Sequence, residues 1–144
     1  LLLEIIKKNM YEKIKKYAII YTKFLEMGGY MNFNAKVSVI NNNENIIFNT
    51  ICKKSNDTIM YIEKDNLHTR TTYNYEKNVL RRRNDDYKIE YLFDKDKITE
   101  GIIETKEHKA IVKIETTKIK IENDNIEIEF KVEGQPITYR VEKE

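Results

Sequence analysis

The sequence predicts an all-β domain, an antiparallel up-and-down barrel of about eight to ten short strands, preceded by one helix. Beyond Phe33, apolar and polar residues alternate in short runs, and polar turn residues recur about every ten positions, a spacing typical of sandwiches and barrels. None of the connectors is long enough for a crossover helix, so consecutive strands should pair antiparallel. With 144 residues, the chain is long enough for one domain with its own core.

Residues 1–27 place apolar side chains at helical spacing, with lysine and glutamate on the other side. The stripe consists of Leu3, Ile6, Met10, Ile14, Tyr17, Tyr21 and Phe24. Gly28-Gly29 is a helix stop signal. We interpret residues 1–30 as an amphipathic helical extension that docks this stripe on the barrel.

A competing hypothesis is a mis-assigned start, with the true start at Met31, because residues 27–30 can be encoded by a stretch resembling a ribosome-binding site. A membrane-surface helix is the least favoured interpretation, since the net charge of residues 1–30, six Lys against three Glu, is modest.

Residues 31–144 form the predicted barrel domain. Its expected strands are 33–40, 46–53, 58–64, 67–74, 78–83, 87–93, 98–105, 109–121, 125–133 and 137–143. Gly and Pro are rare, so the turns must be built largely from Asn and Asp, which tolerate left-handed backbone better than other residues.

The alternation also predicts which side chains face inward. Two late strands are clearest, and their apolar faces are Tyr87, Ile89, Tyr91 and Phe93 in one and Ile126, Ile128, Phe130 and Val132 in the other. Within 109–121 the apolar positions change from even (Ile114) to odd (Ile119) numbers. A β-bulge across residues 116–118 would restore the pattern, and bulges are how strands turn the corner of a barrel.

Charge and cysteine content exclude several classes of protein. Six of the 26 basic and three of the 24 acidic residues lie within residues 1–30, which leaves 20 basic and 21 acidic side chains in the barrel domain. A domain that binds nucleic acid through its phosphates needs a basic surplus, so we expect no nucleic-acid partner. Cys52 is the only cysteine, which favours a reducing cytoplasm. No apolar run is long enough for a signal peptide core or a membrane span, so no membrane partner is expected.

Several ordered motifs resemble the YwiB-like family. They are Ile59-Met60-Tyr61-Ile62-Glu63, Val79-Leu80-Arg81-Arg82-Arg83, Tyr91-Leu92-Phe93, Gly101-Ile102-Ile103-Glu104-Thr105, Ile114-Glu115-Thr116 and the 126–132 strand. Members of that family are uncharacterised bacterial proteins with a lipocalin-like, calycin-type β-barrel. The resemblance covers about residue 33 to the end. It implies a lipocalin-like barrel in a bacterial cytoplasmic protein, and it leaves the function open.

The arginine run of residues 81–83 is the densest charge of the barrel domain. Arg82 faces opposite to Arg81 and Arg83, because side chains alternate along a strand. Of the three, Arg82 best matches the arginine of the resembling family, and we take it as the inward-facing one. The structural interpretation ties Arg82 to carbonyls or a carboxylate at a strand end. The functional interpretation gives it an anionic group of a ligand to hold.

We expect a non-enzymatic binding protein whose barrel holds a small, partly apolar ligand. Inward tyrosines offer an apolar ring with a polar tip, although tyrosine is also a common strand residue that packs against neighbouring strands. The candidate ligand-binding residues are Arg82, Tyr61, Tyr91 and Thr105. A binder of this kind should contain a cavity of several hundred Å³. The alternative is a protein-interaction module with a side-chain-filled barrel, which recruits a partner through its outer face or an imperfectly closed edge.

The sequence offers no catalytic or metal-binding constellation. His68, His108 and Cys52 are separated by irregular intervals without metal-ligand spacing, so we expect no metal or other cofactor. Cys52 alternates with Phe48 and Thr50, which favours a small core residue. There is no glycine-rich phosphate loop and no serine elbow, and no carboxylate pair is marked out by its neighbours for acid–base work. The oligomeric state and the identity of a ligand are left open.

Overall fold

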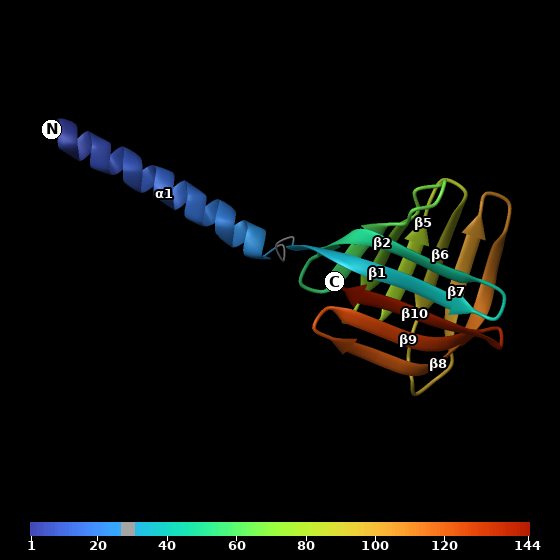
Figure 1. Ribbon diagram of the computed structural model, residues 1–144. Helices are drawn as coiled ribbons and strands as arrows, with labels where there is room; N and C mark the ends of the chain where they lie inside the picture. Colours follow the sequence, from blue (N-terminus) through green and yellow to red (C-terminus); the bar gives the residue numbers. More distant parts are fainter. Residues whose placement is uncertain (27–30) are drawn as a thin grey trace.

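The computed structural model describes residues 1–26 and 31–144, and within α1 it describes the side chains of residues 1–16 and Ala18. Residues 31–144 form a closed antiparallel barrel of ten strands, and one helix precedes it (Figure 1). The predicted fold class is confirmed. Each strand pairs with its neighbours in sequence, and the pairing of the first strand with the last closes the ring.

All ten predicted strands are present. The elements are α1 Leu2–Glu26, β1 Met31–Asn41, β2 Asn45–Lys54, β3 Thr58–Ile62, β4 Arg70–Asn74, β5 Val79–Arg83, β6 Tyr87–Leu92, β7 Thr99–Thr105, β8 Lys109–Glu122, β9 Asn125–Val132 and β10 Gln135–Lys143. β4 begins three residues later than predicted, because the Asp65 carboxylate accepts hydrogen bonds from the Thr69 amide and hydroxyl and holds the preceding residues in a loop. β10 begins two residues earlier, because Glu133 and Gly134, both with positive φ, make a tight two-residue turn.

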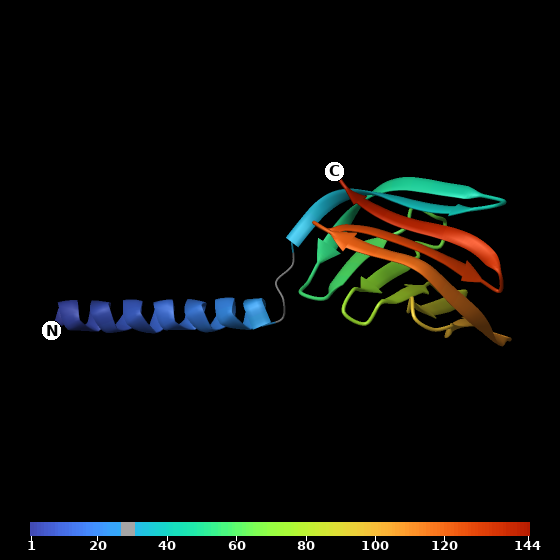
Figure 2. The same ribbon diagram turned by 90° about the horizontal axis from the view of Figure 1, so that it is seen from below.

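α1 projects away from the barrel in both views (Figures 1 and 2). All its described side chains are exposed, including Leu3, Ile6, Met10 and Ile14 of the apolar stripe. The expectation that this stripe packs on the barrel is therefore wrong for these residues. The predicted stop signal, Gly28-Gly29, lies outside the described residues. Among the residues that the structure describes, no helix has both the length and the apolar character needed to cross a bilayer.

The core fills most of the barrel interior. Its side chains come from alternate positions of the strands, as the period-two pattern predicts, and the most buried large ones are Tyr73, Phe93, Ile59, Ile114 and Ile128. Cys52 is fully buried among them, which confirms its interpretation as a core residue. Full burial of one such large apolar side chain contributes roughly 1.5–3 kcal/mol. The register of β8 against β9 shifts between Thr116 and Lys118, so the predicted bulge is also confirmed.

Two features of the barrel position the site. The first is the end formed by the turns β1–β2, β3–β4, β5–β6, β7–β8 and β9–β10, which we call the mouth end. The second is the seam between β2 and β3, which has two residue pairs, Lys53↔Met60 and Lys54↔Ile59. Every other pairing of the described strands has at least five. The seam is therefore the weakest part of the wall.

Candidate functional site

A cavity of about 180 Å³ lies at the mouth end of the barrel. β1, β2, β5, β9 and β10 supply an apolar wall, which consists of Val37, Val39, Ile46, Leu80, Phe130 and Ile137. The polar lining consists of Asn41, Tyr61, Glu63, Arg82, Tyr91 and Tyr139. The cavity is smaller than the several hundred Å³ expected, because Phe93, Phe130 and Tyr73 fill the barrel beneath it.

Two larger hollows lie beside ion pairs elsewhere on the barrel. One of about 390 Å³ lies beside Glu127 and Arg140, whose side chains point outward from β9 and β10 and pair with each other. Another, of about 330 Å³, lies at the opposite end of the barrel beside Lys54 and Asp124, which also pair. The mouth cavity differs from both in its apolar wall: tyrosines aside, six apolar side chains line it, against two in the first of these hollows and three in the second.

Arg82 enters the cavity from β5. In this strand Leu80 and Arg82 face inward, whereas Arg81 and Arg83 are exposed on the outer surface. The sequence therefore assigns the inward arginine correctly. Arg81 is paired on the outside with Glu90 at 2.9 Å, so the two neighbouring arginines meet different carboxylates on different sides of the sheet.

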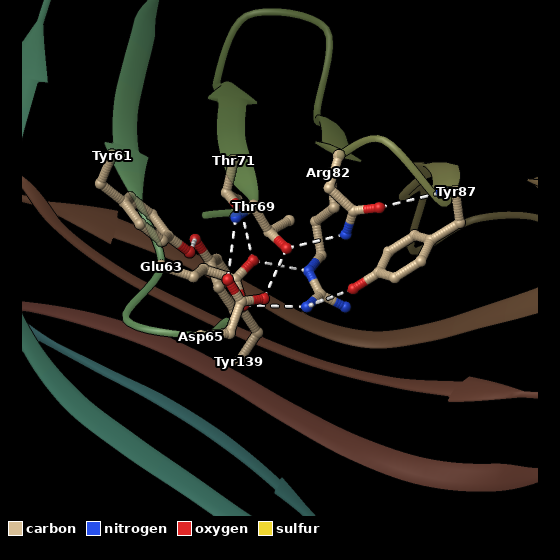
Figure 3. A network of polar contacts seen from close by, with 9 residues as sticks. Tyr61, Glu63, Asp65, Thr69, Thr71, Arg82, Tyr87 and Tyr139 are labelled. Atoms are coloured by element: carbon tan, nitrogen blue, oxygen red, sulfur yellow. Dashed lines mark hydrogen bonds and ion pairs between the residues drawn. The ribbon is translucent and has the colours of Figure 1, made fainter. Parts of the chain in front are cut away.

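Glu63 binds Arg82 through both carboxylate oxygens (Figure 3). Arg82 Nε donates to Oε2 and Nη2 donates to Oε1, each at 2.8 Å. The side chain of Glu63 is 10% exposed and that of Arg82 is 29% exposed. Burial disfavours the charge of Arg82, but the hydrogen bonds and charge of Glu63 outweigh this effect and hold the pKa of Arg82 above its ordinary value. This is the carboxylate partner that the structural interpretation of Arg82 requires.

Thr71 and Tyr87 extend this ion pair into the neighbouring strands. The Thr71 hydroxyl, on β4, donates to Glu63 Oε2 at 2.5 Å. Arg82 Nη2 also lies 3.4 Å from the Tyr87 hydroxyl of β6, and the guanidinium faces the Tyr87 ring. The end of β3 and the strands β4, β5 and β6 thus each contribute one side chain to this cluster around the Arg82–Glu63 pair.

Tyr61 and Tyr139 form a second polar pair below the ion pair. Their hydroxyl oxygens are 2.6 Å apart, and both residues are 3% exposed. Burial raises the pKa of both phenols far above the ordinary value, so both are un-ionised and carry their protons. One hydroxyl donates to the other, which leaves one proton of the pair without a partner among the described residues. That proton can be donated to a ligand in the cavity.

The rim of the mouth is held by the loop before β4 and the turn before β6. Asn84 Nδ2 donates to the Thr69 hydroxyl at 2.9 Å, and the Thr69 hydroxyl donates to Asp65. Burial would raise the pKa of Asp65, but the hydrogen bonds from the Thr69 hydroxyl and amide hold it below its ordinary value. The Asn84 carboxamide oxygen also accepts from the Tyr87 amide. This chain of contacts fixes the rim next to Arg82 (Figure 3).

Tyr91 is positioned by a glycine. It lies opposite Gly101 in the β6–β7 register, and a Cβ at Gly101 would lie 2.6 Å from Tyr91 Cδ1 and 3.0 Å from a methyl of Val112. No other residue leaves room for the ring. The ring also packs edge-on against Phe130 at 5.9 Å. Burial raises the pKa of Tyr91, so its hydroxyl is un-ionised.

The structure brings together three of the four residues predicted from the sequence. Arg82, Tyr61 and Tyr91 line the cavity, whereas Thr105 is exposed at the end of β7, where its hydroxyl bonds to His108 of the next turn. The sequence analysis misses Glu63 and Tyr139. Glu63 continues the inward series of Ile59 and Tyr61, so its parity could have identified it.

The described side chains, those of residues 1–16, Ala18 and residues 31–144, include no group of three His, Cys, Asp or Glu placed to hold a metal ion. The cavity lining described above contains one carboxylate, Glu63, whose two oxygens are already bound by Arg82 and Thr71. The arrangement is therefore a neutral ion pair and a set of phenols above an apolar wall, a combination that can bind and orient a small molecule.

Comparison with known proteins identifies one solved structure with this fold. It is described as the crystal structure of ywiB protein from Bacillus subtilis, and it has a TM-score of 0.51 and 12% sequence identity. The match covers 78% of this chain and 90% of that one. No protein-family model matches this chain, and no curated protein matches it. At this identity the likeness shows a shared fold.

Proposed function

We propose that this chain is a non-enzymatic, cytoplasmic binding protein of the YwiB-like, lipocalin-like type, which holds a small, partly apolar molecule in its mouth cavity. Arg82, Tyr61 and Tyr91 are the proposed polar anchors, joined by Glu63 and Tyr139. Thr105 drops out of the set, since it lies outside the cavity. The shared fold with the ywiB protein supports the family, and the single buried cysteine fits a reducing compartment.

The placement of the Arg82–Glu63 pair carries the proposal. Moving two charges out of water costs several kcal/mol per ion, and an apolar pair of similar volume often stabilises a fold as well or better. An ion pair placed beside an apolar hollow therefore supports a role other than stability. Small-molecule sites combine these two elements, an apolar wall and a few convergent polar groups.

A non-enzymatic role is supported by the state of the polar groups. The Tyr61 and Tyr139 phenols have pKa values raised by burial, so neither supplies a base near neutral pH. The Glu63 carboxylate is bound by Arg82 and Thr71, which leaves it poorly placed to take a proton from a substrate.

A cavity-filling substitution tests the proposal. The protein is purified from its own host and examined by native mass spectrometry, and a panel of small molecules is screened by thermal shift. Ile137→Trp fills the apolar side of the cavity without touching the ion pair, and Ile47→Trp, on the exposed face of β2, is the matched control. We expect Ile137→Trp to abolish the bound mass and the stabilisation, and Ile47→Trp to retain both. Equal stabilisation of both variants would contradict the proposal.

The β2–β3 seam favours a second candidate, the protein-interaction module. The described pairs of this seam end at Lys53, so residues 45–49 of β2 have β1 on one side and no paired strand on the other. Residues 45–52 carry no charge, although natural edge strands are usually protected by charged residues. Ile47 and Ile51 are 54% and 60% exposed on this strand. An extended segment of a partner could pair with this edge.

An edge-specific charge tests this second candidate. Ile47→Lys should abolish co-purification of a partner from the native host, and Ile111→Lys, at a similarly exposed isoleucine of β8, should not. Amide hydrogen exchange at residues 45–49 should also slow when the partner is bound. Unchanged exchange in the complex would exclude strand pairing at this edge.

A further inference from the structure

The charges lining the mouth cavity cancel. Arg82 and Glu63 are its guanidinium and its carboxylate, and the remaining polar lining described above is one amide, Asn41, and phenols whose protons are retained. Two hydrogen bonds, each 2.8 Å long, join the guanidinium of Arg82 to the carboxylate of Glu63. A ligand entering this site therefore meets a dipole of fixed direction and no net charge.

The unused hydrogen-bonding capacity of this site is mostly that of a donor. Glu63 Oε2 accepts from Thr71 and from Arg82, and Oε1 accepts from Arg82, so little acceptor capacity remains. On Arg82, Nε and Nη2 are committed, whereas Nη1, with its two protons, has no protein partner among the described residues. The Tyr61–Tyr139 pair keeps one further hydroxyl proton.

Charged ligands are disfavoured for separate reasons. An anion at Arg82 Nη1 would be attracted by the guanidinium but repelled by Glu63, whose charge already neutralises the guanidinium. The anion would also lose its own hydration. A cation would compete with Arg82 for Glu63, whose oxygens are occupied. A neutral acceptor such as a carbonyl oxygen incurs neither penalty, and it can accept a hydrogen bond from a donor that has no protein partner among the described residues.

From this charge and donor balance we infer that the ligand is an uncharged small molecule with an apolar body and one carbonyl-type acceptor, which accepts a hydrogen bond from Arg82 Nη1 or from the Tyr61–Tyr139 pair. This inference rests on the proposed function and names the chemical class of its ligand. The cavity of about 180 Å³ limits the apolar body to the size of a single six-membered ring. The anionic ligand considered from the sequence alone does not fit, since Glu63 takes the position of that anion.

Three probes with the same ring, similar size and different charge test the class. They are cyclohexanecarboxamide, cyclohexanecarboxylate and cyclohexylmethylammonium, titrated into the full chain at pH 7 and constant salt. Binding is measured by NMR, with the methyl groups of Val39 and Leu80 reporting on the cavity. We expect the carboxamide to bind at least tenfold more tightly than either charged probe, a difference of about 1.4 kcal/mol.

A charge change at Glu63 provides the reciprocal test. Glu63→Gln keeps the side-chain shape but leaves the Arg82 charge uncompensated, so the preference should shift toward the carboxylate by at least tenfold. Glu90→Gln is the matched control, because Glu90 holds Arg81 on the outer face of the barrel. It should leave the order of the three probes unchanged. A Glu63→Gln variant that does not fold leaves the three-probe comparison on the unaltered chain as the deciding measurement.

The outcomes separate the ligand class from the proposed function. Tightest binding of the carboxylate or the ammonium probe to the unaltered chain overturns the uncharged class and leaves small-molecule binding in place. If none of the three probes shifts the Val39 and Leu80 methyls, the inference is overturned; if the small-molecule panel also fails to stabilise the chain, the proposed function falls with it. A carboxamide that binds without shifting these methyls occupies another site and also overturns the inference.

Discussion

Replacing Arg82 by methionine should strongly destabilise the barrel. Arg82→Met removes both hydrogen bonds to Glu63 and leaves the carboxylate, 10% exposed, with the Thr71 hydroxyl as its remaining partner. Loss of one partner of a buried ion pair costs about 3–5 kcal/mol. Because the Arg82 side chain is 29% exposed and water reaches that end of the pair, we expect a loss near the lower limit, about 3 kcal/mol.

The double variant Arg82→Met/Glu63→Met should recover most of this loss. With both charges gone, no ion is left buried and unpaired, and two methionines fill a similar volume next to an apolar wall. We expect a net cost of about 1 kcal/mol relative to the unaltered chain, which reflects the stranded Thr71 hydroxyl. The double variant should thus be more stable than Arg82→Met alone.

Urea unfolding, followed by circular dichroism, measures these differences. Arg81→Met is the control, because its pair with Glu90 is about half exposed on both sides and such surface pairs contribute roughly 0–1 kcal/mol. The unfolding slope should be the same for all variants, so that the midpoints report stability. If Arg82→Met costs no more than Arg81→Met, or if the double variant is less stable than Arg82→Met, the assignment of a buried, mutually dependent pair is refuted.

Four further predictions follow from other parts of the chain. Thr116→Val should raise stability by up to about 1 kcal/mol in the same urea assay, because the Thr116 hydroxyl is buried without a partner in the described structure; a loss would mean that this hydroxyl is bonded. Burial raises the pKa of the Cys52 thiol to about 11, so a thiol reagent at pH 8 should react at the rate of unfolding, and immediate labelling would contradict this burial. The hydrogen bond from Lys54 holds the pKa of Asp124 below its ordinary value. The pair therefore stabilises the fold above the unfolded-state pKa of about 3.9, and this stability is lost as the pH falls through the lower folded-state pKa. Asp124→Asn should reduce the acid-induced loss of stability, and an unchanged acid profile would exclude this contribution. Deletion of residues 1–30 should leave the urea midpoint of the barrel unchanged, since the described side chains of α1 are exposed, and a lower midpoint would reveal packing against the barrel.

The sequence predicts much of the fold because strand periodicity is a local property. Alternation within β6 and β9 identifies their inward faces, and the parity change around Thr116 locates a bulge. The same rule predicts that Arg82 faces opposite to Arg81 and Arg83, and the family resemblance then selects Arg82 as the inward one. These features depend on residues a few positions apart, which a single chain displays directly.

The site is predicted less completely because it depends on register between strands. Glu63 and Arg82 are 19 positions apart, and Tyr61 and Tyr139 are 78 apart, so no local pattern links either pair. Thr105 has the parity of inward residues, but it lies at the end of β7, where the chain has passed beyond the enclosed part of the barrel. Parity gives the face of a strand, whereas position along the barrel axis decides whether that face is enclosed.

The meander also has a consequence for how the chain folds. Within the described strands, nine pairings join neighbours in sequence, and each can form as a hairpin soon after its turn. The tenth, between β1 and β10, brings together residues about a hundred positions apart, such as Ala35 and Lys143, at a larger cost in loop entropy. We therefore expect the closing of the ring to limit the folding rate and to occur after most hairpins have formed.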